Sequence, residues 1–564
     1  MLSESYSWKR FLPFLALYAV YFLGQFMDIM EIDAVQYAVI AWEMAEKNNY
    51  LETYQRGGDY LDKPPLLFWV SALAYKIFGV SNFAFRFFPV LLSFLGAYAT
   101  YRLAKLYYSE QVAYWSALFL ASSQAVFLMN HDVRTDNMLT TFVAFSLWQL
   151  GAYLKEGKWL NLVGAFVGIG LAMLAKGPIG FVIPILTFGP DILAKRNWKK
   201  IFDWKYLIGL AITSLILLPM CVGLYQQFDM HPEKIVNGQQ GVSGLKFFFW
   251  TQSFGRITGE NVWANNPDPF FLVHTTFWSF LPWTAFLVIA YIAETKRILK
   301  IGFKKVAENE EIFLWAGYTL TFLALSQSKY QLNHYIYPIY SLGAILTAKH
   351  LEKILMWKAK YLHILQIWVA FQLLILMAIV ALLGYWVFPL QNWWVMAGIL
   401  LGFGLALYFF AKIKKDVGNK WVMASFMGIL TANFFMNAHF YPTLISRYQS
   451  ESVVAKKMKN NPQSYDIEKL VVVGEGLMQN SIDFYSQKII PRVPDVELLS
   501  KGKYWLLCDQ EVYEKGIRNN KAVKIISQEI FEDFHVSTLS PEFLSPATRS
   551  QTLRRTHLLQ AEKY

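Results

Sequence analysis

The run FLPFLALYAVYFLGQFM, residues 11–27, decides the fold class, because it is almost entirely apolar and long enough to cross a hydrocarbon core of about 30 Å. Lys9 and Arg10 precede it, as in a signal peptide, but no small-residue cleavage site follows and similar runs recur to about Phe440. It is therefore expected to be a retained helix. With 55% hydrophobic and 16% charged residues among 564, the chain is predicted to be a polytopic α-helical membrane protein.

The apolar runs predict about 13 transmembrane helices. Their expected ranges are 11–27, 82–107, 111–129, 138–154, 159–176, 178–194, 206–227, 270–293, 311–327, 335–350, 362–388, 393–412 and 420–440. The stretch PPLLFWVSALAYKIFG, residues 64–79, is assigned to the membrane surface, because paired prolines and a short length suit a helix that lies on or dips into the interface.

Basic residues indicate how these helices are oriented. The net charge of +12 would suit a nucleic-acid partner, but the basic residues gather in clusters between apolar runs, at 195–200, 296–305, 349–360 and 412–415. Such clusters are typical of cytoplasmic loops, so no nucleic-acid partner is expected. With a cytoplasmic N-terminus, 13 spans place all four basic clusters in the cytoplasm. A fourteenth span would move every cluster that follows it to the outer side of the membrane. The expected outer segments are 28–81, 130–137, 228–269, 328–334 and 441–564.

The C-terminal part has a different character from residues 1–444, the expected transmembrane catalytic domain. In residues 445–564, EKLVVVGEG and KYWLLCDQ are typical of short buried strands, and SVVAKKMKN and SIDFYSQK of helices. We expect a small periplasmic α/β domain, with the basic end, SPATRSQTLRRTHLLQAEKY, loosely ordered. Only two cysteines occur, Cys221 and Cys508, so a disulfide framework is not expected.

Acidic residues on the outer side are the first functional candidates. Asp33 and Tyr37 are four residues apart, on one face of a helix through AVQYAVIAWEMAEK. The connection NHDVRTDNMLTTF adds Asp132, Arg134 and Asp136 on the same side of the membrane. For Asp33 and Asp136 the alternative is a helix N-cap, which Asp favours. Together, acids and bases beside apolar helices suit a substrate with a charged head and a lipid tail.

Further candidates lie in other outer connections. Arg256 and Glu260 come from FGRITGENVWANNPDPFF, and Lys329, His334 and Tyr335 from SQSKYQLNHYIYP. Lys63 has the alternative of an anchor that snorkels to the interface. Lys176, in LAKGPIGFVIP, and Arg86 could instead serve membrane topology or packing. His131 and His334 could instead be ordinary surface histidines. Nothing resembles an HExxH pattern, a Walker loop or a dinucleotide fingerprint.

Four motifs, an acidic first outer loop and an α/β tail together resemble the GT-C superfamily of polyprenyl-phosphate-sugar glycosyltransferases. The motifs are YLDKPPLLFW, RTDNMLTTF, LAKGPIGFVIP and SKYQLNHYIYP. The similarity is to the branch of lipid A aminoarabinose transferases and protein O-mannosyltransferases. It implies that Asp33 and Asp136 are the catalytic aspartates. It further implies that donor phosphate meets Lys63, Arg256, Lys329 and Tyr335, and that Tyr37 contacts the substrate. The remaining candidates for substrate contact are Arg86, Arg134, Lys176 and Glu260.

The resemblance also implies a divalent metal beside Asp62, although the histidine that the family places shortly after a DN pair is absent from ENVWANNPDP. The expected reaction is inverting transfer of a sugar from a polyprenyl-phosphate donor to a lipid acceptor such as lipid A. The cations would stabilise the leaving phosphate, and Asp33 would accept the acceptor's proton or, for a phosphate acceptor, orient it. A protein O-glycosyltransferase, a lipid or glycan transporter and a non-enzymatic scaffold remain as alternatives.

Overall fold

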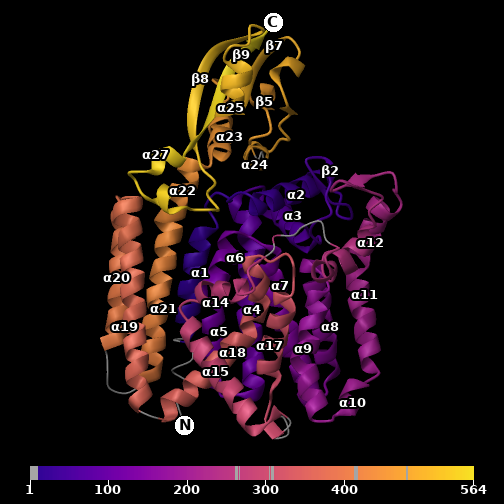
Figure 1. The fold of residues 1–564 in the computed structure, drawn as a ribbon, viewed down its shortest axis with the longest axis vertical. Coiled ribbons are helices and arrows are strands. Elements are labelled where there is room, and N and C mark those ends of the chain that lie inside the picture. Colours follow the sequence, from indigo (N-terminus) through magenta and orange to yellow (C-terminus); the bar gives the residue numbers. More distant parts are fainter. Residues whose placement is uncertain are drawn as a thin grey trace.

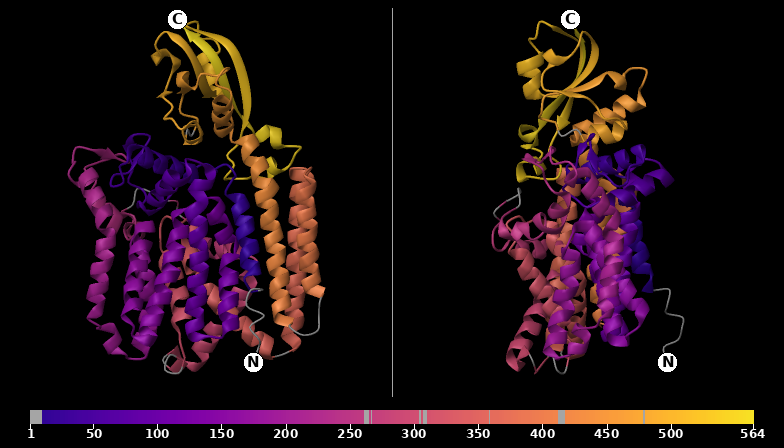
Figure 2. Two further views of the ribbon diagram at one scale, coloured as in Figure 1. Left: turned by 180° about the vertical axis from the view of Figure 1, so that it is seen from behind. Right: turned by 90° about the vertical axis from the view of Figure 1, so that its right-hand side faces the viewer.

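A computed structural model of the chain describes residues 10–260, 265, 267–303, 305–306, 310–357, 359–411, 417–477 and 480–564. A bundle of long helices carries a smaller unit built on a β-sheet at one end (Figure 1). Rotated views show this unit beyond the same end of the bundle (Figure 2).

The first half of the bundle begins with α1 (Leu12–Gly24) and contains the helices that surround the candidate site. Short connections turn most of them back on one another, and α7 packs against both α4 and α8. The bounds are α2 (Asp33–Lys47), α3 (Leu66–Phe78), α4 (Asn82–Tyr107), α5 (Glu110–Ala121), α6 (Gln124–His131), α7 (Thr135–Glu156), α8 (Trp159–Lys176), α9 (Ile179–Ala194), α10 (Trp198–Ile201) and α11 (Lys205–Leu224).

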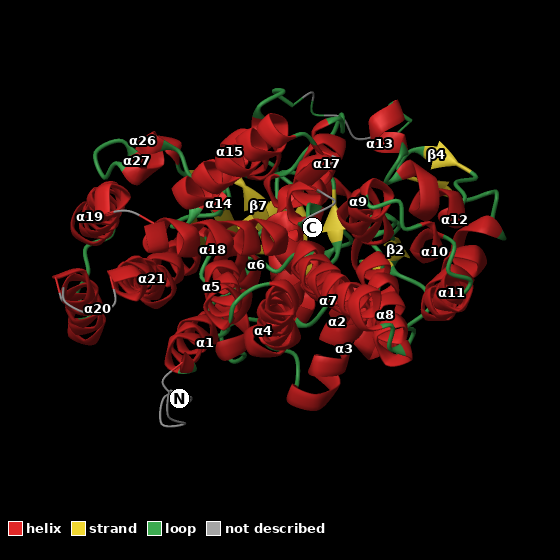
Figure 3. Cartoon of the chain, turned by 90° about the horizontal axis from the view of Figure 1, so that it is seen from below, coloured by secondary structure: helices red, strands yellow, loops and turns green. Residues whose placement is uncertain are grey.

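The second half of the bundle places α19, α20 and α21 along one side, whereas α10, α11 and α12 lie along the other side (Figure 3). A 3₁₀ segment, η5, leads into α18. The bounds are α12 (Gly244–Lys246), α13 (Gly255–Thr258), α14 (Phe271–Ser279), α15 (Thr284–Ile301), α17 (Phe313–Ser326), η5 (Asn333–Ile339), α18 (Tyr340–Trp357), α19 (Ala359–Ala381), α20 (Trp393–Ala411), α21 (Val417–Phe435) and α22 (Tyr441–Tyr448).

The helix boundaries follow local sequence signals. The hydroxyls of Ser81 and Ser109 accept hydrogen bonds from backbone N–H groups in the first turns of α4 and α5. Asn48 and Gly157 end α2 and α7 in the left-handed conformation, at φ 51° and 71°. The Ser81 cap explains why α4 begins at residue 82, as expected from the sequence.

Two expected spans are broken instead of continuous. The run 111–129 forms α5 and α6, bent by 44° where Ser123 starts a new helix and its hydroxyl accepts from Val126 N–H. The run 270–293 forms α14 and α15 on either side of Pro282, which supplies no backbone N–H. Apolar composition alone does not distinguish such breaks from a straight helix.

The chain is a multi-pass membrane protein. Among the described residues, six helices are long and apolar enough to cross a membrane, and the bent pair α5–α6 would make a seventh. Shorter apolar helices include α1, α3, α9 and α17. The count of about 13 spans stays a prediction. The helix α3, expected at the membrane surface, lies with α2 across the end of the bundle that faces the sheet (Figure 1).

The C-terminal unit is a five-stranded mixed sheet in the order β6-β5-β7-β9-β8. The expected strands and helices are confirmed as β5 (Leu470–Val473), β7 (Gly502–Asp509), α23 (Ser450–Asn460) and α24 (Asn480–Ser486). The remaining strands are β6 (Arg492–Val493), β8 (Val523–Asp533) and β9 (Arg554–Lys563). The boundary expected at residue 445 falls inside α22 and stays a prediction.

The expectation of a loosely ordered C-terminal end is wrong. The strand β9 lies inside the sheet and pairs antiparallel with β7 and β8. Its central residues, Thr556 to Leu559, are buried, and only its flanks carry charge. The basic and polar residues around this short run concealed it in the sequence.

Candidate functional site

A cleft opens among α7, α8, α9, α17 and η5, with an empty volume of about 930 Å³. The cleft has an apolar wall, made by side chains from α9 and α17, and a cationic end, where basic side chains gather. The lining residues are Lys63, Leu139, Lys176, Pro178, Ile179, Val182, Gln252, Ser253, Phe254, Arg256, Ala324, Leu325, Ser328 and Tyr335. Such a cavity suits a ligand with an anionic head and an apolar tail.

Tyr335 brings two of the cations together. Its hydroxyl accepts a hydrogen bond from Arg256, and the Lys176 ammonium lies 4.1 Å from the centre of its ring. Arg256 is buried, and its Nε has no hydrogen-bond partner among the described residues. A buried donor without a partner costs free energy, so an anionic ligand at this place would satisfy it.

The KGP motif shapes the wall at Lys176. Lys176 is the last residue of α8, and Gly177 follows at φ +114°, a conformation that residues with a Cβ rarely adopt. A Cβ on Gly177 would lie 3.4 Å from the Ser253 hydroxyl. The chain therefore turns sharply into α9 while the segment that leads to Arg256 approaches closely.

Asp136 is not a helix N-cap. Arg134 is the N-cap residue of α7 and makes no side-chain cap, while Asp136 lies in the first turn. Its carboxylate pairs with Lys176, and Nε2 of His334 lies 3.6 Å from its Oδ2. The Asp136 side chain is only 2% exposed, so this carboxylate belongs to a closed pair and holds Lys176 in the wall of the cleft.

Asp33 is not an N-cap either, because it is the first residue of α2 and Ile32 precedes it without a side-chain cap. Its carboxylate pairs with Arg134, whose second partner is Asp132 at 2.8 Å. The Asp33 side chain is 38% exposed. Tyr37, one turn later, is buried with its ring 5.9 Å from that of Phe68. The structure thus brings Asp33 and Arg134 together from segments 101 residues apart.

Burial and neighbouring charges set the protonation of this cluster. Burial opposes the charge of Arg134, but Asp132 and Asp33 outweigh it and raise the pKa of Arg134, which stays a cation. Burial, with the cations Lys176 and Arg134, lowers the pKa of His334 well below its ordinary value. His334 is therefore neutral at pH 7 and meets Asp136 without forming an ion pair.

A second cavity, of about 840 Å³, adjoins the first at η5, since Tyr335 lines the first and His334 the second. It reaches the C-terminal unit. Its lining residues are Met30, Leu128, Met129, His131, Asp132, Arg134, Trp278, Asn333, His334, Tyr337, Tyr441, Val536, Ser537 and Leu539. Arg134 lines this second cavity, so the Asp33–Arg134 pair lies at its edge.

Arg86, Glu260 and Lys329 are among the expected site residues that line neither cavity. Arg86 is completely buried and donates to the carbonyl oxygens of Met27, Asp28 and His131. Direct contact of Arg86 with a substrate is therefore not supported. Glu260 accepts from the indole N–H of Trp250 at 2.9 Å and is exposed.

Lys329 has an exposed side chain, and its backbone N–H donates to the carbonyl oxygen of Arg256 at 3.0 Å. It lies near the cationic end of the cleft without lining it, so its contact with a phosphate stays a prediction.

The surroundings of Asp62 do not fit a metal. Its carboxylate pairs with the Lys63 ammonium at 2.5 Å, and the Gln252 amide donates to its carbonyl oxygen. Within the part of the chain that the structure describes, no group of three or more His, Cys, Asp or Glu residues could hold a metal ion. A neighbouring ammonium and an amide donor are not metal ligands, so no catalytic step is derived through a metal.

Sequence reasoning missed several members of the site. Gln252 had no motif to mark it, and its role depends on a fold that brings residue 252 to residue 62. The alternative of surface positions for His131 and His334 is wrong. His131 is 2% exposed and stacks on Tyr441 at 3.9 Å, and His334 lies beside Asp136.

Comparisons with known proteins agree with this geometry. Residues 62–222 match the family described as dolichyl-phosphate-mannose-protein mannosyltransferase, a range that includes the KPP, RTD and KGP motifs. An uncharacterized protein of Aquifex aeolicus (strain VF5) is 26% identical over 83% of this chain and 86% of its own length.

Undecaprenyl phosphate-alpha-4-amino-4-deoxy-L-arabinose arabinosyl transferase 2 of Proteus mirabilis (strain HI4320) is 26% identical over 56% of this chain. The match spans only 54% of that enzyme, so the chain covers about half the length of this curated relative.

The crystal structure of ArnT from Cupriavidus metallidurans bound to undecaprenyl phosphate has a similar fold. Its TM-score is 0.71 at 16% identity, and the match covers 98% of both chains. The apo state of the same protein gives a TM-score of 0.71 at 17% identity, over 99% of this chain and 98% of the other. The fold is therefore shared along nearly the whole chain, and the resemblance expected from the sequence is confirmed.

Proposed function

We propose that this chain is an integral-membrane inverting glycosyltransferase. It resembles the GT-C polyprenyl-phosphate-sugar glycosyltransferases in their aminoarabinose-transferase and protein-mannosyltransferase branch. Its donor is a sugar on a polyprenyl phosphate. The observation that carries this proposal is the cleft whose cationic end, with an unpartnered buried donor on Arg256, continues into an apolar wall of α9 and α17.

The donor lies with its phosphate at Lys63, Lys176 and Arg256 and its polyprenyl chain along the apolar wall. These cations are fixed before the substrate binds, Lys176 by Asp136 and Arg256 by Tyr335. Preorganised charges stabilise a transition state in which negative charge grows on the leaving phosphate. The apolar wall explains why the reacting groups border the bilayer.

The acceptor approaches through the second cavity, which Asp132, Arg134 and His334 line. Its oxygen attacks the anomeric carbon from the side opposite the phosphate. The new C–O bond forms as the bond to the phosphate oxygen breaks, and the bonding electron pair leaves with the phosphate. The acceptor's proton passes to the Asp33 carboxylate, which Arg134 holds in place. A phosphate acceptor would need no proton transfer, and Asp33 would then orient it.

A lipid acceptor such as lipid A, or another glycolipid, is favoured. A third cavity, between α14, α15 and α17, is lined largely by apolar residues, among them Phe277, Leu287 and Phe322. Its Phe277 is adjacent in sequence to Trp278 of the second cavity, so acyl chains could lie close to the acceptor head. A protein O-glycosyltransferase is the alternative, favoured by the family that matches residues 62–222.

The end of the molecule that carries the sheet faces the periplasm in this proposal, and the protein lies in the bacterial inner membrane. The start of α10, within the basic cluster 195–200, lies at the opposite end of the bundle (Figure 1). Such clusters stay in the cytoplasm. A transporter is disfavoured because its ionisable residues would lie near the bilayer midplane, whereas α2 lies across the end of the bundle.

The test is sugar transfer by purified protein in proteoliposomes, with a panel of undecaprenyl-phosphate sugars and lipid acceptors. Asp33→Asn should lower kcat by about 10²–10⁴ while donor binding persists, because a general base is lost. Arg256→Gln should instead raise the KM for the donor. Arg518→Gln, on an exposed position of the C-terminal unit, is the matched control and should behave as wild type.

Two results would contradict the proposal. One is a folded wild-type protein that moves no sugar from any polyprenyl-phosphate donor in the panel. The other is an Asp33→Asn protein that keeps the full rate, which would remove Asp33 from the reaction.

A further inference from the structure

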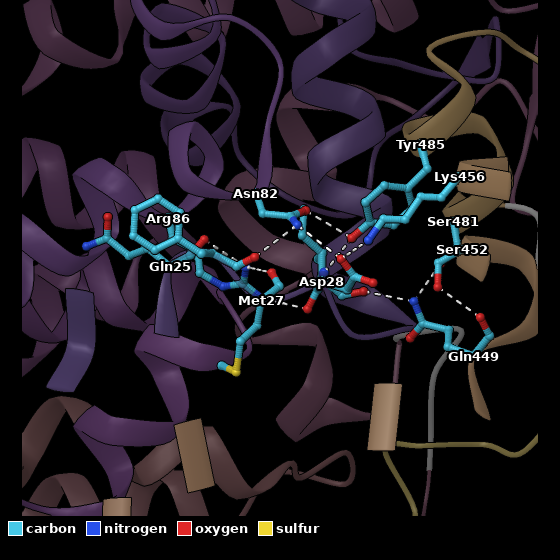
Figure 4. Close-up of polar contacts among 12 residues, drawn as sticks. Gln25, Met27, Asp28, Asn82, Arg86, Gln449, Ser452, Lys456, Ser481 and Tyr485 are labelled. Carbon is cyan, nitrogen blue, oxygen red and sulfur yellow. Dashed lines mark hydrogen bonds and ion pairs between the residues drawn. The ribbon is translucent and has the colours of Figure 1, made fainter. Parts of the chain in front are cut away.

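The segment Met27–Ile32 connects α1 with α2 and ends directly before Asp33. It has no regular secondary structure of its own, so other parts of the chain must hold its backbone polar groups. Figure 4 shows that these partners come from two directions, from α4 on one side and from the C-terminal unit on the other.

From the bundle side, Arg86 of α4 holds the segment. It donates to the carbonyl oxygens of Met27 at 2.5 Å and Asp28 at 3.0 Å. It also donates to the carbonyl oxygen of His131 at 3.1 Å, three residues before Arg134, which pairs with Asp33. One buried guanidinium thus joins the backbone that leads to Asp33 with the backbone that leads to Arg134.

From the other side, Tyr485 of α24 and Gln449 hold the same segment. The Tyr485 hydroxyl accepts from Ile29 N–H at 2.7 Å and donates to Asn82 Oδ1 at 2.9 Å. The buried Gln449 amide accepts from Glu31 N–H at 3.1 Å and donates to the Ile29 carbonyl oxygen at 3.0 Å. Three backbone groups that immediately precede α2 therefore depend on side chains from residues 449 and 485.

The C-terminal unit also holds the far end of α2. Helix α24 packs along α2, and Asp483 pairs with Arg56, whose backbone N–H donates to the Glu43 carboxylate of α2. Lys456 of α23 pairs with Asp28. The unit therefore contacts the segment before α2 and a turn that is bonded to Glu43 near its C-terminal end, so a shift of α2 relative to the unit would break these bonds.

We infer that the C-terminal α/β unit sets the position of Asp33, with Tyr485 and Gln449 as its positioning residues and Arg86 as their counterpart in the bundle. The inference rests on the proposed function, because the position of Asp33 matters only if Asp33 takes part in sugar transfer. Since a displacement of about 1 Å can cost 10²-fold in rate, fixing the start of α2 from both sides would preserve the geometry at Asp33.

The test compares kcat and KM in the transfer assay. Tyr485→Phe and Gln449→Met each remove hydrogen bonds of the Ile29–Glu31 backbone with little change in volume. Each should lower kcat roughly threefold to tenfold, the range expected for a hydrogen bond whose loss is felt at the reacting groups. The donor KM should stay at the wild-type value, because Lys63, Lys176 and Arg256 are untouched.

A double variant separates positioning from a general loss of structure. If Tyr485 acts through Asp33, Tyr485→Phe should cause no further loss of rate when Asp33 is already Asn. Tyr465→Phe is the matched control, since its hydroxyl bonds Glu529 inside the same unit and should leave kcat unchanged. Unchanged kcat in both Tyr485→Phe and Gln449→Met, or an equal loss with and without Asp33, would overturn the inference.

A second measurement does not depend on transfer. In a protein with Asp33→Cys and the two native cysteines changed to serine, a small thiol reagent should label residue 33 at a different rate once Tyr485→Phe is added. The Tyr465→Phe addition should leave that rate unchanged. If the labelling rate changes but the protein with Asp33 intact transfers no sugar, the positioning role stands and the proposed reaction is rejected. An unchanged labelling rate would reject the positioning role.

Discussion

Two carboxylates at the candidate site differ in what surrounds them. Asp136 pairs with Lys176, and its side chain is 2% exposed, whereas the side chain of Asp33, paired with Arg134, is 38% exposed. A closed pair is part of the scaffold, while a partly open one can meet a substrate. Asp136 and Asp33 were indistinguishable in the sequence, where both carried the alternative of an N-cap.

The closed pair leads to the first prediction, on stability. Asp136→Asn should lower the free energy of unfolding by about 3 kcal/mol, because it leaves the Lys176 ammonium, whose side chain is only 13% exposed, without its ion-pair partner. The double variant Asp136→Leu with Lys176→Met should be more stable than the single one, although it should bind the donor poorly. Unfolding in detergent, followed by denaturant titration, measures both effects.

The exposed pair of Lys105 and Glu110 is the matched control. Glu110→Gln should change the free energy of unfolding by less than about 1 kcal/mol, as is usual for surface pairs. An Asp136→Asn protein as stable as wild type would show that Lys176 does not depend on Asp136 for its charge.

At the scale of elements, the junction between α2 and the C-terminal unit is unusually acidic for a buried contact. Burial raises the pKa of Glu31 from its ordinary value of 4.5 to about 7, opposed by a hydrogen bond with Ser481 and reinforced by Asp533. Burial likewise raises the pKa of Asp483 to about 7, despite its pairing with Arg56. Both groups lie where α24 meets the start and the end of α2.

This junction leads to a prediction of pH dependence. A carboxyl group whose pKa is raised in the folded state stabilises the fold fully below its unfolded pKa of about 4.5. That stability is lost as the pH rises toward 7. The midpoint of thermal unfolding should therefore be lower at pH 8 than at pH 5.

Glu31→Gln cannot ionise and should reduce the difference between the two midpoints. Glu511→Gln, on an exposed turn of the same unit, is the control and should keep the wild-type difference. A wild-type midpoint that rises from pH 5 to pH 8 would contradict the prediction.

The whole molecule has two chemically different ends. The sheet, α2 and α3 gather at one end, and α10 lies at the other (Figure 1). The segments with Asp33 and Asp136, expected on one side of the membrane, indeed share one site through Arg134, two residues before Asp136. Two segments can share a site in this way only if they lie on the same side of the membrane.

The orientation gives the third prediction. After both native cysteines are changed to serine, single cysteines at the exposed positions Lys515 and Lys199 should react from opposite sides of the membrane. An impermeant maleimide should label Lys515→Cys in intact spheroplasts and Lys199→Cys only after lysis, because basic clusters stay in the cytoplasm. The cysteine-free protein sets the background, and labelling of both positions in intact spheroplasts would contradict the topology.

The sequence by itself determined most of the helices, the strands β5 and β7, and the motifs that line the cleft. Apolar runs, serine caps and the Gly-Pro turn after Lys176 act over a few neighbouring residues, so they can be recognised in one stretch of chain. The same local rules missed the break at Pro282 and the strand β9, whose neighbours in the sheet lie elsewhere in the chain.

Only the tertiary structure decided which charges are paired and which residues hold Asp33. The bond from Ile29 to Tyr485 joins positions 456 residues apart, and Lys176 meets Asp136 across 40 residues. Such contacts depend on how whole helices pack, and packing leaves no periodic pattern at either residue. Short-range sequence signals therefore specified the helices and motifs that make up the site, and long-range packing specified how they are arranged.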